Sequence, residues 1–176
     1  AVARRAAMDM GKEYEDVNLI VAHMGGGISV GAHEKGKVVD VNNALDGEGP
    51  FSPERAGSLP AGELAKLAFS GEIELDELLR RITGGGGLVA HLGTNDLREV
   101  ERLRKESDEK ADLIFRAMTY AISKEIAARA AVLKGQVDLV VLTGGLAHSE
   151  TFTKAIEERV SFIASVKVYP GEDEMK

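Results

Sequence analysis

The stretch that decides the fold is Val17-Asn18-Leu19-Ile20-Val21-Ala22-His23-Met24-Gly25-Gly26-Gly27-Ile28-Ser29-Val30-Gly31. An apolar run rich in Val and Ile leads into three glycines, and a second apolar run follows them. This pattern predicts a buried strand, a turn and a returning strand. A tight hairpin needs only one or two residues at positive φ, so the surplus glycine indicates that another group approaches the backbone closely. Successive N–H groups in such a turn suit phosphate oxygens, whereas a hairpin without a ligand is the alternative.

Further strands complete a predicted sheet around this hairpin. The strands expected in chain order are 17–23, 27–33, 37–43, 137–143 and 166–169. Tight turns join the first three, which should form an antiparallel meander. The last two flank a helix from about residue 149 to 163, so they should lie parallel through a right-handed crossover. The pattern predicts an α/β fold with a mixed five-stranded sheet, three antiparallel strands and then two parallel, flanked by helices.

Helical periodicity covers most of the remaining chain. A helix over 1–12 precedes the first strand, and a long helix over 107–134 precedes the fourth. The apolar stripe of this long helix consists of Phe115, Met118, Ile122, Ile126, Ala130 and Leu133. The expected N-caps are Ser107 or Asp108 for the long helix and Thr94 or Asn95 for a charged helix before it. We predict a helical insertion over about 62–105, interrupted by the glycines at 84–87.

A long loop from residue 42 to 62 precedes this insertion and is not of low complexity, which is typical of a functional loop. Arg55 stands alone there among small and turn-forming residues. It is either a surface charge or a rigid fork for carboxylate or phosphoryl oxygens. His23 ends a strand beside the glycine turn, where it is either a hydrogen-bonded structural residue or a phosphate contact. Gly144-Gly145 precede a helix whose N-terminus could bind phosphates or a sugar; a plain strand-to-helix turn is the alternative.

Composition excludes several classes of function. The chain has 176 residues, 44% of them hydrophobic, a net charge of −7 and no cysteine. An acidic protein is a poor partner for nucleic acid or an anionic membrane, and without cysteine it forms no disulfide or thiolate metal site. No apolar run reaches the roughly 18 residues of a membrane span, so we expect a cytoplasmic location. Both ends interrupt helical patterns, and we therefore expect a piece of a longer protein.

Three motifs occur in order along the chain: HMGGGISVGAH (23–33), DGEGPFSPERAGSLP (46–60) and LTGGLAHS (142–149). Together they resemble the acetate kinase family, and more closely its butyrate kinase branch. The resemblance implies the fold of the acetate and sugar kinase, chaperone and actin superfamily, with two ribonuclease H-like lobes and ATP between them. Residues 1–176 resemble the C-terminal, nucleotide-binding lobe. The N-terminal lobe and the closing helix of the family are absent from this sequence.

The resemblance also implies roles for particular residues. ATP and its phosphates are expected at His23, Gly25, Gly26, Gly27, Asp96, Leu97, Arg98, Gly145, Leu146, Ala147, His148 and Ser149. Arg55 matches the arginine that stabilises the phosphoryl group during transfer, and Asp173 and Glu174 resemble the carboxylates that bind Mg²⁺. Acetate kinases carry Asn in place of Gly26 and Gly-Glu-Asn in place of residues 147–149, and both departures fit the butyrate branch.

The implied activity is transfer of a phosphoryl group from ATP to butanoate or another short-chain fatty acid, giving ADP and an acyl phosphate. The isolated chain is expected to be inactive, because half of the cleft is missing. The resemblance also implies a homodimer or a higher homo-oligomer. Two alternatives remain open at this point: a non-enzymatic nucleotide-dependent module of the chaperone or actin type, and a lobe of a sugar kinase.

Overall fold

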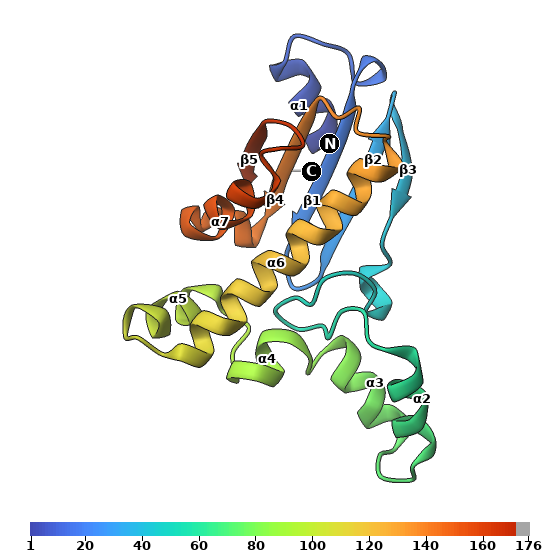
Figure 1. Ribbon diagram of the computed structural model, residues 1–176, viewed down its shortest axis with the longest axis vertical. Helices are drawn as coiled ribbons and strands as arrows, with labels where there is room; N and C mark the ends of the chain where they lie inside the picture. Colours follow the sequence, from blue (N-terminus) through green and yellow to red (C-terminus); the bar gives the residue numbers. More distant parts are fainter. Residues whose placement is uncertain (172–176) are drawn as a thin grey trace.

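The computed structural model describes residues 1–171, which form one five-stranded sheet in the order β3-β2-β1-β4-β5. The strands are β1 Asn18–Met24, β2 Ile28–Glu34, β3 Lys37–Val41, β4 Leu139–Gly144 and β5 Val166–Pro170. Strands β1, β2 and β3 pair antiparallel, whereas β4 lies parallel to β1 and β5 parallel to β4. The predicted mixed sheet is therefore confirmed, and its helices flank it as Figure 1 shows.

Both faces of β1 are buried, which is why its sequence reads as an unbroken apolar run. Alternate residues point to opposite faces of the strand. Ile20, Ala22 and Met24 pack on the side of α6 (Glu109–Val132) and α7 (Glu150–Val160). Leu19 and Val21 pack on the other side, where Ala3, Ala6 and Ala7 of α1 (Val2–Asp9) cover the sheet.

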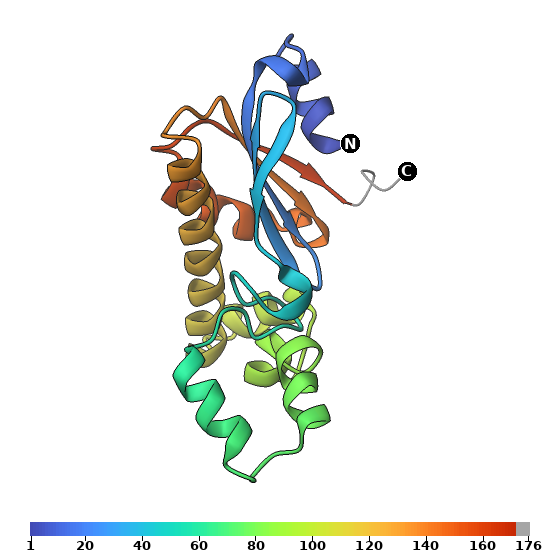
Figure 2. The same cartoon turned by 90° about the vertical axis from the view of Figure 1, so that its right-hand side faces the viewer.

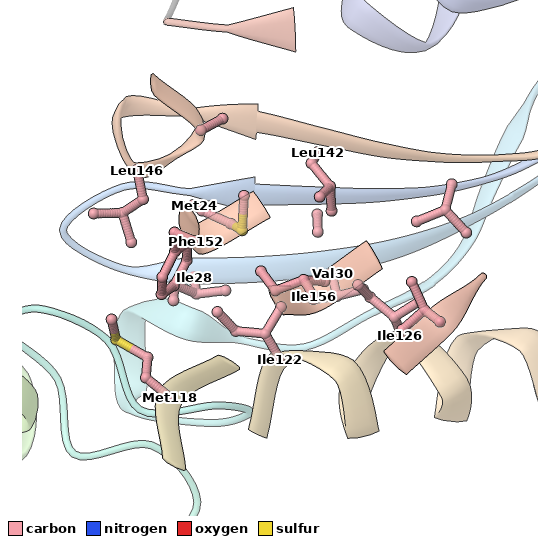
Figure 3. Packing of buried hydrophobic residues seen from close by; sticks show 14 of the residues in the cluster. Met24, Ile28, Val30, Met118, Ile122, Ile126, Leu142, Leu146, Phe152 and Ile156 are labelled. Atoms are coloured by element: carbon pink, nitrogen blue, oxygen red, sulfur yellow. The ribbon is translucent and has the colours of Figure 1, made fainter. Parts of the chain in front are cut away.

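The larger core lies under α6, and most of its predicted stripe is confirmed. Phe115, Met118, Ile122 and Ile126 are at most 2% exposed, and Figure 3 shows three of them facing Ile28 and Val30 of β2. Asp108 caps the helix, as predicted, by accepting a hydrogen bond from the N–H of Ala111 at 2.9 Å.

The predicted insertion consists of α2 Ala61–Phe69, α3 Leu75–Thr83, α4 Gly87–Leu92 and α5 Leu97–Lys105. Helices α2 and α3 project from the sheet as an arm (Figures 1 and 2), and no residue of α2 is buried. The expectation for the cap of α5 was one residue off, since Asp96 caps it by accepting from the N–H of Arg98 at 2.9 Å. Asn95 is an equally good capping residue by type, but its side-chain amide instead donates to Glu54.

Helix α4 was missed by sequence reasoning, which read the run at 84–87 only as an interruption. The glycines there also let the backbone approach the long loop. A Cβ on Gly87 would lie 1.7 Å from the carbonyl oxygen of Ser52, and one on Gly86 would lie 2.5 Å from the nitrogen of Ala56. The first turn of α4 therefore packs directly on the segment that carries Arg55.

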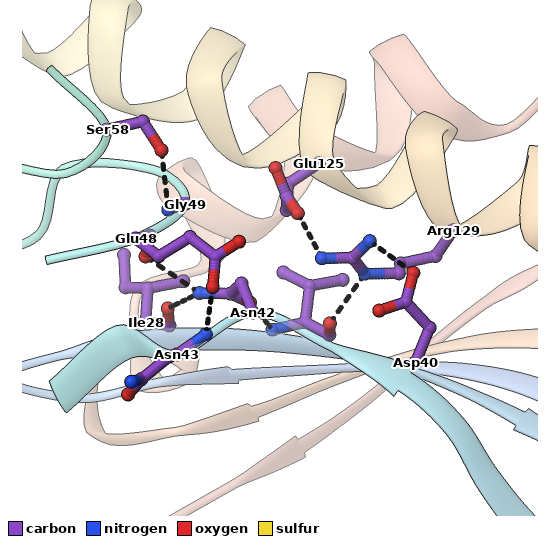
Figure 4. A network of polar contacts seen from close by, with 10 residues as sticks. Ile28, Asp40, Asn42, Asn43, Glu48, Gly49, Ser58, Glu125 and Arg129 are labelled. Atoms are coloured by element: carbon purple, nitrogen blue, oxygen red, sulfur yellow. Dashed lines mark hydrogen bonds and ion pairs between the residues drawn. The ribbon is translucent and has the colours of Figure 1, made fainter. Parts of the chain in front are cut away.

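A buried arginine joins α6 to the sheet. Arg129 donates from Nε to the carbonyl of Val30 at 2.9 Å and from Nη1 to Asp40 at 2.8 Å, and it also pairs with Glu125 (Figure 4). Its planar fork meets three acceptors from two strands and its own helix. This contact fixes the long helix against β2 and β3.

A buried amide joins β2 to the long loop beyond β3. Asn42, 4% exposed, accepts from the N–H of Val30 at 2.7 Å. Its Nδ2 donates to the carbonyls of Ile28 at 3.0 Å and of Glu48 at 2.9 Å (Figure 4). The side chain thereby continues the hydrogen bonding of the sheet where β3 has ended.

Among residues 1–171, no helix is both long and apolar enough to cross a membrane.

Candidate functional site

The glycine turn between β1 and β2 separates two hollows at one end of the sheet. The first has a volume of about 690 Å³ and the second about 540 Å³. Gly25 and Gly26 line both of them, so the two hollows adjoin at this turn. Two consecutive residues of the long loop line different hollows: Glu54 lines the first and Arg55 lines the second.

The turn offers fewer donors than its three glycines suggest. The N–H of Gly25 donates to the carbonyl of Gly27 at 3.0 Å and so closes the turn on itself. Within the described part of the chain, no acceptor takes the N–H of Gly26 or Gly27. Two backbone donors therefore remain for an anion.

The group that approaches the turn closely is Arg55 itself. A Cβ on Gly27 would lie 1.8 Å from Nη1 of Arg55, so any larger residue would displace the guanidinium. Nη1 donates to the carbonyl of Ala44 at 2.8 Å, in the 3₁₀ turn Ala44–Asp46. The close approach expected from the sequence is confirmed, and glycine at position 27 leaves the space that the Arg55 guanidinium occupies.

His23 lines the second hollow together with Ser29 and Arg55. It pairs with Thr143 of β4 across the sheet, and its Nε2 would lie 3.4 Å from a Cβ on Gly25. The structure thus places the histidine, the turn and the arginine in one hollow.

Ser52 and Glu54 were not assigned roles from the sequence. The hydroxyl of Ser52 donates to the carbonyl of Gly26 at 2.6 Å and accepts from the N–H of Arg55 at 3.1 Å. Glu54 accepts from the amide of Asn95 at 2.7 Å, which fixes its carboxylate beside the turn. The contacts of Ser52 with Gly26 and of Glu54 with Asn95 span 26 and 41 positions, and no local pattern signals them.

The far wall of the first hollow brings together two segments predicted to meet there. Asp96, Leu97 and Arg98 face Gly145, Leu146, His148 and Ser149 across it. Ala147 does not line the hollow; it is 3% exposed and packs in the core.

Polar side chains of this wall form hydrogen bonds with one another or with nearby residues. The side chain and the N–H of Arg98 hydrogen-bond to Asp96 and hold the pKa of that carboxyl below its usual range. The hydroxyl of Ser149 caps α7 by accepting from the N–H of Phe152 at 3.0 Å, and it donates to Glu101. Glu101 lines the same hollow and was also missed, because nothing in its sequence context sets it apart.

The charged groups that line the first hollow are mostly carboxylates, so its charge suits an anion that is bound together with a cation. Glu54, Asp96 and Glu101 line it against the single guanidinium of Arg98. Carboxylate oxygens are the donors that Mg²⁺ prefers, usually one or two together with phosphates. Residues 1–171 contain no cluster of three or more metal-binding side chains. The predicted ligands Asp173 and Glu174 lie outside the described residues.

Comparison with solved structures shows to which fold class the chain belongs. The chain superposes on the acetate kinase of Porphyromonas gingivalis with a TM-score of 0.89 at 27% identity, covering 98% of this chain and 50% of that one. A propionate kinase from Francisella tularensis subsp. tularensis SCHU S4 gives 0.87 at 23% identity, covering 99% and 50%. A ROK hexokinase from Thermus thermophilus gives 0.53 at 20% identity, covering 94% and 58%. The fold is therefore that of one lobe of the acetate and sugar kinase, chaperone and actin superfamily.

A match to a sequence model of a protein family shows the family of the chain. The model of the acetokinase family matches residues 1–169, and the chain belongs to that family. The chain spans about half the length of the solved kinases it matches.

Proposed function

We propose that the chain is the nucleotide-binding lobe of a carboxylate kinase of the butyrate kinase type. The full-length protein would convert ATP and butanoate, or another short-chain fatty acid, into ADP and butanoyl phosphate. The observation that carries this proposal is the glycine turn between two hollows, with free N–H groups at the turn and Arg55 against it. Membership of the acetokinase family supports a carboxyl group as the acceptor.

The first hollow would hold ATP. Its volume of about 690 Å³ suits a nucleotide, with the turn at one end and the segments 96–98 and 145–149 along the wall. The N–H groups of Gly26 and Gly27 would bind phosphate oxygens. Mg²⁺, when bound, would neutralise phosphate charge. Glu54, whose carboxylate lies beside the turn, would help to hold it together with Asp173 and Glu174.

The second hollow would receive the acceptor. A carboxylate oxygen of butanoate attacks the γ-phosphorus, and the bond from that phosphorus to the bridging oxygen of ADP breaks. Charge on the transferring group is met by the guanidinium of Arg55, whose position is set by the carbonyl of Ala44. His23 in the same hollow would contact the phosphoryl oxygens.

Trapping the acyl phosphate tests this proposal. The full-length protein is incubated with ATP, Mg²⁺ and butanoate, and hydroxylamine converts any acyl phosphate into a hydroxamate. We expect turnover with short fatty acids and none with hexoses. Arg55→Ala should lower kcat by roughly 10³-fold, in the range for an arginine that stabilises phosphoryl transfer.

Arg116→Ala is the matched control, because Arg116 is exposed on α6 and pairs only with Asp112 among the described residues. It should keep the wild-type rate. Wild-type turnover by Arg55→Ala would remove Arg55 from the mechanism. Phosphorylation of hexoses, or ATP binding with no transfer to any acid, would favour the sugar kinase or the chaperone-type alternative.

We also propose that the full-length protein forms a homodimer or a higher homo-oligomer. The arm supports this, because Phe69 at the end of α2 is 92% exposed and Leu75 at the start of α3 is 66% exposed. Large apolar side chains gathered on a projecting element are typical of interfaces. A monomer by light scattering at micromolar concentration would contradict it.

A further inference from the structure

One buried hydroxyl touches both halves of the proposed phosphoryl site. Ser52 is fully buried in the loop between β3 and α2. Its Oγ donates to the carbonyl of Gly26 at 2.6 Å and accepts from the N–H of Arg55 at 3.1 Å. Both contacts are to backbone groups, and Ser52 lines neither of the two hollows.

The contact with Gly26 sets the direction of the next N–H. The peptide between Gly26 and Gly27 is trans and planar, so its N–H points opposite to its carbonyl. Ser52 Oγ and, at 3.3 Å, the N–H of Glu54 hold that carbonyl from one side. The N–H of Gly27 is thereby turned away from Ser52. A glycine peptide without such a contact has many orientations open to it.

The hydroxyl itself sits on a fixed backbone. The N–H of Ser52 donates to the carbonyl of Arg55 at 3.0 Å, and the carbonyl of Ser52 accepts from the N–H of Leu88 in α4 at 3.1 Å. The close approach of Gly87 leaves no room for the loop to shift toward α4. Because its backbone is held in this way, the Ser52 hydroxyl can keep its hydrogen-bonded neighbours in one defined geometry.

We propose that Ser52 is a positioning residue for phosphoryl transfer, an inference that rests on the proposed function. It orients the N–H of Gly27 and the backbone of Arg55 together, so that both meet the transferring phosphoryl group in one arrangement. Ser52 does not touch the substrate. Its effect should therefore appear in the chemical step and not in substrate binding.

Ser52→Ala in the full-length protein tests the proposal. The carbonyl of Gly26 keeps the N–H of Glu54, and alanine fits the space, so the variant should fold. We expect kcat to fall about 10-fold, less than the 10²–10³-fold loss that follows removal of a transition-state donor, because the N–H remains and only its direction is released. The KM values for ATP and butanoate should stay within about 2-fold.

Ser58→Ala is the matched control. The hydroxyl of Ser58 also binds a backbone group of the long loop, the N–H of Gly49 at 2.9 Å (Figure 4), but it contacts neither the turn nor Arg55. It should keep the wild-type kcat. Calorimetric binding of ADP, which lacks the transferred group, should be normal for both variants. Loss of ADP binding by Ser52→Ala, or an equal fall of kcat in both variants, would overturn the positioning role.

A double-mutant cycle with Arg55→Ala shows whether Ser52 acts through the arginine. In the Arg55→Ala background, we expect Ser52→Ala to lower kcat less than about 3-fold. A full 10-fold loss in both backgrounds would overturn the joint positioning of Gly27 and Arg55, because Ser52 would then act without the arginine side chain. The two hypotheses separate cleanly: an unchanged rate for Arg55→Ala contradicts the proposed function, whereas a slow Arg55→Ala with a normal Ser52→Ala contradicts only the role of Ser52.

Discussion

At the scale of single residues, the site is held by contacts between positions far apart in the chain. The glycines of the turn could be read from the sequence, and so could the need for a close approach. That the approaching group is Arg55 could not, since the pattern around residue 27 says nothing of a residue 28 positions later. The same holds for Ser52 and for Glu54 with Asn95.

His33 of β2 gives a residue-scale prediction about pH. Burial lowers the pKa of His33 below its usual value, and the hydroxyl of Tyr14 lies 2.7 Å from its Nδ1. The folded protein therefore binds this proton less readily than the unfolded chain, whose histidine has a pKa near 6.5. The contribution to stability is complete above about pH 6.5 and is lost as the pH falls through the folded value.

Urea unfolding at pH 7 and pH 5 measures this effect. Wild type should lose free energy of unfolding at pH 5, and His33→Gln should lose less of it. His91→Gln, at an exposed position, is the control and should follow wild type. The same pH dependence in His33→Gln and wild type would contradict the prediction.

At the scale of elements, the sheet was predictable and part of the insertion was not. Apolar runs that end at glycine predict strands, and β1, which is buried on both faces, is the clearest case. Helix α4 has a glycine at its first position and was read as a break. Its reason to form is tertiary: Leu88 is fully buried, and the first turn packs on the long loop. Local propensity cannot report such a contact.

The contacts of Arg129, which join α6 to the sheet, give a prediction at the scale of elements. Arg129→Lys keeps the charge but cannot reach the carbonyl of Val30, Asp40 and Glu125 together. We expect the free energy of unfolding to fall by about 2 kcal/mol, because the buried carbonyl of Val30 and the partly exposed Asp40 lose bonds to the guanidinium.

Chemical denaturation of the two variants makes the comparison. Arg116→Lys on the same helix alters an exposed pair with Asp112 and should change the free energy of unfolding by less than about 0.5 kcal/mol. Equal losses in Arg129→Lys and Arg116→Lys would show that α6 is not anchored through Arg129.

At the scale of the whole molecule, residues 1–171 contain a hydrophobic core on each face of the sheet, as domains that fold on their own do. The chain nevertheless spans about half of the kinases it matches. We therefore predict that the 176-residue chain unfolds cooperatively and binds ADP, but forms no butanoyl phosphate.

Calorimetry and the hydroxamate assay on the purified 176-residue chain check this prediction, with the full-length protein as the positive control. Transfer needs groups on both sides of the phosphoryl group, and under the proposed function this chain supplies only some of them. Turnover by the chain alone would contradict it, and so would the absence of a cooperative unfolding transition.

The alternation of Glu54 and Arg55 across the glycine turn has a consequence for how the protein can diverge. Because neighbouring residues serve opposite hollows, inserting or deleting a single residue between 52 and 55 would move the carboxylate and the guanidinium to the wrong sides. A substitution there changes one side chain and leaves the others in place, whereas a change of length misplaces both charged groups. A deletion scan should therefore find tolerance at the tip of the arm, around Gly71, where a side chain would meet nothing within 4 Å. In the segment 52–55, a change of length should lower activity more than any single substitution does.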